Sequence, residues 1–205
     1  MKNALISSVL IILLFSCGPS TKITGSWNYE SEPVHFKQIA IIGIGKNPDV
    51  RKTVEETFED MLTAKGFNAI GGLEFLPPNA STETLTKEVL IEFLKLNKID
   101  GVISISLLKK EDDRRYVQGV YYYVPQYDVP LTDYYGQMSN YVYAPGYYAG
   151  SEHYFLECSL FNFPEGKMLW SAQTLTSPFG SLQTTIDEYA KVVVNDLIKS
   201  GILLK

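Results

Sequence analysis

The sequence has few of the residues that build metal sites and disulfide scaffolds. It contains two Cys and two His among 205 residues. These numbers are too small for a Cys-rich zinc site or for a small fold held by several disulfides, so stability must come from a packed core. The hydrophobic fraction of 45% and the charged fraction of 20% are typical of an ordinary folded domain.

Positive charge is also scarce. Lys and Arg together number 18 against 23 Asp and Glu, which leaves a net charge of −5. Non-specific binding of nucleic acid depends on a positive field over much of the surface, so DNA and RNA are not expected as partners. No cofactor or metal ion is expected either, because the sequence contains no complete motif for one.

The N-terminal hydrophobic run is too short to cross a bilayer. Met1 to Asn3 carry one Lys, and twelve mainly apolar residues follow from Ala4 to Phe15. A membrane-spanning helix needs about 20 residues, whereas an apolar run of about 7–15 residues after a positive charge is typical of a secretory signal peptide.

The run ends in Leu14-Phe15-Ser16-Cys17, which resembles the bacterial lipobox. That motif has an apolar residue at −3, a small residue at −1 and then the Cys that is diacylated before cleavage. We therefore predict a cleaved signal peptide over residues 1–16, lipid attachment at Cys17 and a polar, lipidated tether over residues 17–34. The alternative is an ordinary secretory signal with a chance Cys at the cleavage position.

Palmitate and further acyl chains on Cys17 would hold the protein stably to a membrane without a transmembrane helix. In some lipoprotein lineages a run of Asp or Glu after the lipidated Cys directs export to the cell surface, and this chain has none. The expected location is therefore the cell envelope, at the outer membrane, with the domain facing the periplasm.

Residues 35–205 are expected to form a single α/β domain. The first half alternates apolar strand-like runs with amphipathic stretches, in the order β-α-β-α-β, which favours parallel strands with right-handed crossovers. The second half predicts a β-hairpin and a last helix, so the sheet should be mixed, with α+β character. The expected strands are 35–44, 67–70, 99–108, 153–163 and 167–176, and the expected helices begin at 48, 82 and 181.

A Tyr-rich insertion at about 116–154 separates the two halves. It holds twelve of the 14 Tyr and contains no Lys or Arg. Three interpretations remain open: a loop or hairpin that covers the sheet, a recognition surface for a glycan, peptide or protein partner, and a membrane-inserting segment. The candidate contact surface consists of Tyr121, Tyr122, Tyr123, Tyr127, Tyr134, Tyr135, Tyr141, Tyr143, Tyr147 and Tyr148.

No catalytic residue is assigned from the sequence. The loop from Gly43 to Pro48 follows a predicted strand and precedes a predicted helix, but it lacks the spacing of a phosphate-binding loop. Cys158 alternates with apolar neighbours, and His153 lies five positions away, on the opposite face of the same strand. A thiol dyad is therefore disfavoured, and Cys158 is expected to be a core residue.

Several short stretches form a recognisable set along the chain. They are Gly25-Ser26-Trp27, Phe36-Lys37, Gly43 to Pro48, Arg51, Glu55, Asp100-Gly101-Val102, Arg115-Tyr116-Val117, Tyr141 to Tyr148 and Gly166 to Ser171. Together they resemble a group of small bacterial lipoproteins. That group has no established activity, so the resemblance implies location and fold type and supplies no catalytic residues. The element order is also loosely similar to the periplasmic domains of TolB (N-terminal) and CsgG-type envelope proteins, which are interaction modules.

These observations give a hypothesis and one alternative. The hypothesis is a membrane-anchored envelope protein that acts as a non-enzymatic binding or assembly module, with an envelope protein or glycan as partner. The alternative is a hydrolase or transferase of envelope glycans or lipids that uses carboxylates such as Asp112, Asp128 or Asp133.

Overall fold

A computed structural model describes residues 21–30, 32–76, 86–112, 152–178 and 180–205. The predicted signal peptide, Cys17 and all ten tyrosines of the candidate contact surface lie outside the described residues.

The described residues form a six-stranded mixed sheet in the order β1-β7-β6-β5-β3-β4. Strands β3, β4 and β5 run parallel, whereas β5, β6, β7 and β1 pair antiparallel. A small parallel pair, β2 with β8, stands apart. The strands are β1 (Thr21–Asn28), β2 (Val34–His35), β3 (Ile39–Ile44), β4 (Ala69–Gly71), β5 (Gly101–Asp112), β6 (Glu152–Asn162), β7 (Met168–Thr176) and β8 (Leu203–Leu204).

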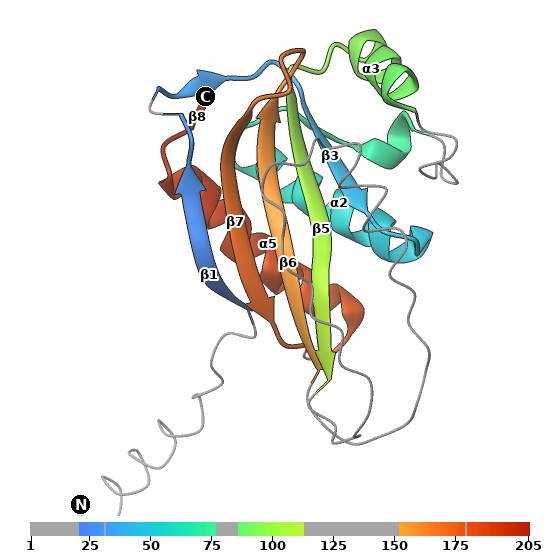
Figure 1. Ribbon diagram of the computed structural model, residues 1–205, viewed down its shortest axis with the longest axis vertical. Coiled ribbons are helices and arrows are strands. Elements are labelled where there is room, and N and C mark those ends of the chain that lie inside the picture. Colours follow the sequence, from blue (N-terminus) through green and yellow to red (C-terminus); the bar gives the residue numbers. More distant parts are fainter. Residues whose placement is uncertain (1–20, 31, 77–85, 113–151, 179) are drawn as a thin grey trace, which may run out of the picture.

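Helices cover the two faces of the sheet unequally (Figure 1). The long helices α2 (Pro48–Ala64) and α5 (Leu182–Lys199) lie side by side on one face, where the ring of Phe58 contacts that of Tyr189. The shorter α3 (Lys87–Leu96) packs on the other face near one end, around Leu94, Ile99 and Val102. The apolar cluster under α3 is built on the parallel strands β3 and β5, whereas the larger cluster under α2 and α5 also includes residues of the antiparallel strands β6 and β7.

The start of α2 shows how local sequence determines an element. The side chain of Asn47 accepts hydrogen bonds from the backbone N–H groups of Asp49 and Val50, and Pro48 occupies the first helical position. At the other end the chain turns at Gly66, whose φ of +88° suits glycine. The predicted α/β class, with a mixed sheet and a C-terminal helix, is confirmed.

The tether predicted over 17–34 is wrong for residues 21–28, which form strand β1 at the edge of the sheet. Two hydrogen bonds attach this strand to α5: Ser26 Oγ donates to Asp196 Oδ2 at 2.5 Å, and Asn28 Nδ2 donates to the Ser200 carbonyl at 3.0 Å. The sequence signal was weak because an edge strand has one neighbour and most side chains of β1 remain exposed. β5 also runs on to Asp112, and β6 begins at Glu152, inside the predicted insertion.

Candidate functional site

The end of the sheet where β1 begins brings together three of the places where the described chain meets segments outside it: the start of β1, the end of β5 and the start of β6. Thr21 of β1 stands in one cross-strand row with Thr176, Tyr154 and Lys110. Three strand spacings of about 4.8 Å put Thr21 roughly 14 Å from Lys110. Two residues beyond Lys110, Asp112 pairs with Glu152. We call this end of the sheet the anchor end. Thr21, Asp112 and Glu152, which adjoin residues 1–20 and 113–151 in the sequence, all lie there.

Polar contacts hold the anchor end together. The hydroxyls of Thr21 and Thr176 are 3.1 Å apart. Glu152 accepts a hydrogen bond from the Tyr154 hydroxyl at 2.9 Å, and its other carboxylate oxygen is 3.1 Å from Lys110 Nζ. Burial and the hydrogen bond to Glu152 raise the pKa of Tyr154. These contacts hold the end of β5 and the start of β6 together.

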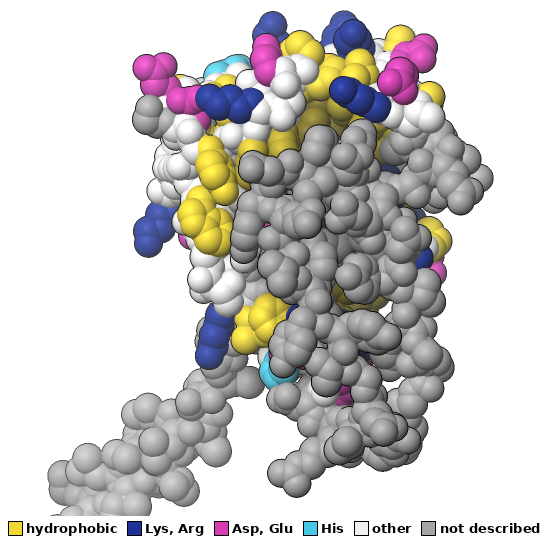
Figure 2. All heavy atoms as spheres, viewed as in Figure 1, with side chains coloured by type: hydrophobic (Ala, Val, Ile, Leu, Met, Phe, Trp, Pro, Cys, Tyr) yellow, Lys and Arg dark blue, Asp and Glu magenta, His cyan; other side chains and the backbone are white. Residues whose placement is uncertain are grey.

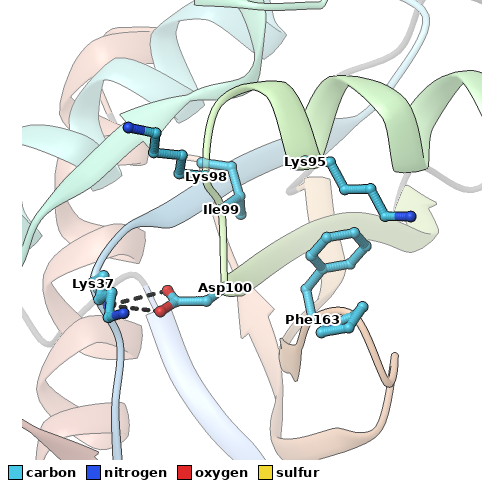
Figure 3. Close-up of a pocket in the computed structure, with 7 residues that line it drawn as sticks. Lys37, Lys95, Lys98, Ile99, Asp100 and Phe163 are labelled. Carbon is cyan, nitrogen blue, oxygen red and sulfur yellow. Dashed lines mark hydrogen bonds between the residues drawn. The ribbon is translucent and has the colours of Figure 1, made fainter.

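The opposite end of the sheet contains a pocket of about 470 Å³ (Figure 3). It lies between the end of α3, the chain entering β3 and the turn that joins β6 to β7. Eleven residue steps along β5, at about 3.3 Å each, put it roughly 36 Å from the anchor end. Its lining residues are Lys37, Lys95, Lys98, Ile99, Asp100, Phe163 and Pro164, and we call it the lysine pocket.

Asp100 fixes the geometry of the lysine pocket. Its carboxylate accepts hydrogen bonds from the backbone N–H of Lys37, at 2.9 and 3.0 Å, and from that of Gln38 at 3.0 Å. Its backbone carbonyl accepts from the N–H of Phe163 at 2.9 Å. One residue thus joins the start of β3, the start of β5 and the β6–β7 turn.

The three lysines of the pocket are exposed and lack a carboxylate partner among the described residues. The ion pairs found in that part of the chain involve other cations: Arg51, Lys52, Lys109, Lys110 and Lys167. In the space-filling view, basic and acidic side chains both lie beside hydrophobic surface at the end of the molecule that carries α3 (Figure 2). This end therefore offers cations next to apolar groups.

A buried ion pair on α2 contacts the loop from Gly43 to Pro48, the segment that most resembles a phosphate-binding loop. Glu55 Oε1 accepts from Arg51 Nε at 2.7 Å and from the backbone N–H of Gly43 at 2.9 Å. Because the Gly43 N–H already donates to this carboxylate, it does not face a ligand. The loop after β3 is held by its own helix, as a turn followed by a helix cap.

The cysteine in β6 is a core residue, as predicted. The Cys158 side chain is fully buried among α5 and sheet residues, and burial raises the pKa of its thiol far above the ordinary range. His153 Nδ1 instead lies 2.8 Å from Ser177 Oγ. Cys158 therefore stabilises the core and is shielded from reactants.

Other predicted site residues are only partly placed. Of the three carboxylates named for an enzymatic alternative, Asp112 lies at the exposed end of β5, and Asp128 and Asp133 lie outside the described residues. Within the described ranges, no group of three His, Cys, Asp or Glu residues could hold a metal ion. No helix of the described chain is long and apolar enough to cross a membrane.

Sequence reasoning missed the lysine pocket. Lys37 lies about sixty positions before Lys95 and Lys98, and no motif links them. The nearest signal was Asp100, a carboxylate just before a strand, in a stretch noted only for its family resemblance, but its partners Lys37 and Gln38 are more than sixty positions away.

No family model matches the chain, and no curated protein matches it. Similar solved structures include the PelC dodecamer from Paraburkholderia phytofirmans, with 14% identity over 84% of this chain and 94% of that chain and a TM-score of 0.46. Lipoprotein GNA1162 from Neisseria meningitidis has 11% identity over 79% and 98% of the two chains, with a TM-score of 0.42. A minor lipoprotein from Acinetobacter baumannii has 10% identity over 80% and 94%, with a TM-score of 0.32. At such low values the proposals below rest on this chain's own residues.

Proposed function

We propose that this protein is a lipid-anchored component of the bacterial cell envelope that acts as a non-enzymatic binding or assembly module. The observation that carries the proposal is the short distance in sequence between the lipobox Cys17 and the first residue of the sheet, Thr21. Four residues span at most about 14 Å even when fully extended. Acyl chains on Cys17 would therefore keep the anchor end of the sheet against the membrane surface.

The same arrangement supports a position near the membrane for the Tyr-rich segment. Asp112 and Glu152, which flank residues 113–151, pair with each other at the anchor end, so with Cys17 acylated both ends of that segment would start near the leaflet. We propose that the tyrosines of this segment contact an envelope protein or a glycan near the leaflet. The proposed location is the outer membrane, with the domain in the periplasm and the lysine pocket turned away from the bilayer.

The anchoring is tested by exchanging each cysteine in turn. Cys17→Ala should abolish labelling with an alkyne analogue of palmitate and should move the protein out of the detergent phase in a phase-partition assay, or leave it as the uncleaved precursor. Cys158→Ala is the matched control, because that buried thiol cannot be acylated in the folded protein, and it should be labelled like wild type. Detergent partition that is unchanged in Cys17→Ala would contradict the anchoring.

The contact surface is tested in cells by photo-crosslinking. A photoreactive aromatic residue is placed at Tyr122, Tyr135 or Tyr143, and in a control at the exposed Lys191 of α5. A discrete adduct at one or more tyrosine positions and none at the control would support a binding module. Adducts with a second copy alone would support assembly of this chain with itself, and the absence of any adduct would contradict a protein partner.

A further inference from the structure

We propose that the lysine pocket binds a small anion that carries an apolar body, such as a carboxylate or phosphate attached to a hydrocarbon or aromatic group. The site differs from the Tyr-rich surface proposed above and lies at the other end of the sheet. It is built entirely from described residues.

Charge is the first argument. Three lysines line the pocket against one carboxylate, a local excess of two positive charges in a chain whose net charge is −5. The Asp100 carboxylate already accepts three backbone hydrogen bonds, and neither it nor any other described carboxylate lies within ion-pair distance of the three ammonium groups. The cations are therefore available to an oxyanion from outside.

The second argument is the apolar surface beside these charges. Ile99, Phe163 and Pro164 line the same pocket, and Figure 3 shows the Lys95 side chain extending above the Phe163 ring. A bare inorganic anion would leave this surface in contact with water. A ligand whose charged group meets Lys95 while its apolar body lies on Phe163 would use both kinds of surface, with Lys37 and Lys98 adding to the local positive charge.

The backbone at Lys98 has an unusual conformation. This residue has φ of +54° at the end of α3, in the left-handed region that favours glycine. The backbone N–H of Ile99 donates to the Leu94 carbonyl and that of Lys98 to the Lys95 carbonyl, so the turn closes as a helix C-cap in which glycine is the usual residue. A lysine at this position places a positive charge at the pocket at the expense of local stability.

Hydrogen bonds within the protein join the chain segments that carry the lysines. Asp100 joins three chain segments by hydrogen bonds, and the capped end of α3 fixes the fourth. A preformed site loses less entropy when it binds a small ligand. Only the exposed lysine side chains would need to change conformation when a ligand binds.

The position of the pocket restricts the source of the ligand, and this step rests on the proposed anchoring. About 36 Å from the anchor end, the pocket lies several Debye lengths of about 8 Å from the leaflet that would hold Cys17. With the sheet standing on the leaflet as proposed, the headgroups of that leaflet would be out of reach of the pocket. The ligand would then be soluble or carried by another envelope component.

The test is ligand-observed NMR of the full-length protein in uncharged detergent micelles, with phenyl phosphate and benzoate as probes. Saturable binding of at least one probe is expected, at least tenfold tighter than that of inorganic phosphate, because only the probes have an apolar body. Equal binding of inorganic phosphate, or no saturable binding of either probe, would overturn the proposal. Preference for phenyl phosphate or for benzoate identifies the ligand as a phosphate or a carboxylate.

Two double variants with the same change in net charge locate the binding. Lys95→Gln with Lys98→Gln should weaken probe binding at least tenfold, whereas Lys65→Gln with Lys191→Gln, at exposed positions at the C-cap of α2 and on α5, should leave it within twofold. Equal weakening in both would mean non-specific attraction and would reject the site. Thermal unfolding shows that each variant is folded, and since Cys17 is not involved, failure here is separate from failure of the anchoring.

Discussion

Arg51 and Glu55 form a buried ion pair one turn apart on α2, with Nε 2.7 Å from Oε1 and side-chain exposures of 6% and 1%. The same carboxylate accepts the backbone N–H of Gly43 at 2.9 Å and that of Leu73 at 2.6 Å. Glu55 therefore connects the end of β3, the 3₁₀ helix after β4 (Gly72–Glu74) and α2. The pair belongs to the framework at the carboxyl edge of the parallel strands.

Glu55→Gln should destabilise the protein by about 3–5 kcal/mol, because it leaves a buried guanidinium without its counter-charge. Glu56→Gln is a matched control, since Glu56 pairs with Lys52 at the same spacing on the same helix but is 61% exposed. That exchange should cost about 0.5 kcal/mol or less. Urea unfolding measures both, and equal losses would contradict the framework role of Glu55.

Two glycines in the sheet should respond differently to alanine. A Cβ at Gly101 would stand 2.7 to 3.0 Å from the ring of Phe36, which is buried, so Gly101→Ala should cost about 1–3 kcal/mol through overpacking. A Cβ at Gly25 would meet the indole of Trp27, which is 44% exposed and free to move aside, so Gly25→Ala should cost less. Thermal unfolding compares the two, and a reversed order would contradict the packing described for Phe36.

Lys98→Gly should stabilise the protein by about 0.5–1 kcal/mol while it weakens binding at the lysine pocket. Glycine removes the strain of the left-handed backbone, and part of this gain is offset by the greater freedom of glycine in the unfolded chain. Lys98→Ala also lacks the charge but keeps the Cβ, so it should weaken binding without the stability gain. Urea unfolding midpoints compare the stability of the two variants. Equal stability would contradict the inference that the backbone at Lys98 is strained.

Stability should fall in alkaline solution because of Cys158. Burial raises the pKa of this thiol above its ordinary value of 9.0, so the folded state keeps a proton that the unfolded state loses. The contribution of the buried thiol to the free energy of unfolding is fully present below pH 9.0. Above that pH it decreases by about 1.4 kcal/mol per pH unit. Burial also raises the pKa values of Tyr154 and Tyr189 above 10.0, so their contributions decrease at higher pH.

Urea unfolding between about pH 8 and 10 tests this linkage. Cys158→Ala should remove most of the loss of stability between pH 9.0 and 10.0, although the smaller side chain lowers stability at every pH. An unchanged pH dependence would show that the Cys158 thiol does not carry the effect.

Strong local patterns in the sequence were reliable guides to the elements. The Ile-rich run before Gly43 became β3, the amphipathic stretch capped by Asn47 became α2, and the hairpin across Pro164 became β6 and β7. β1 was missed because an edge strand with mostly exposed side chains looks like a polar linker. Its place beside β7 depends on pairing with residues about 150 positions away.

The sequence by itself determined the α/β class, the order of the main elements and the lipobox from which the anchoring is inferred, because hydrophobic period, caps and short motifs are local properties. Tertiary structure alone decided that Thr21, Asp112 and Glu152 share one end of the sheet and that Lys37 lines the same pocket as Lys95 and Lys98 at the other. Strand register and helix packing bring such residues together, and both arise from burial of the whole core, which no short stretch of sequence encodes.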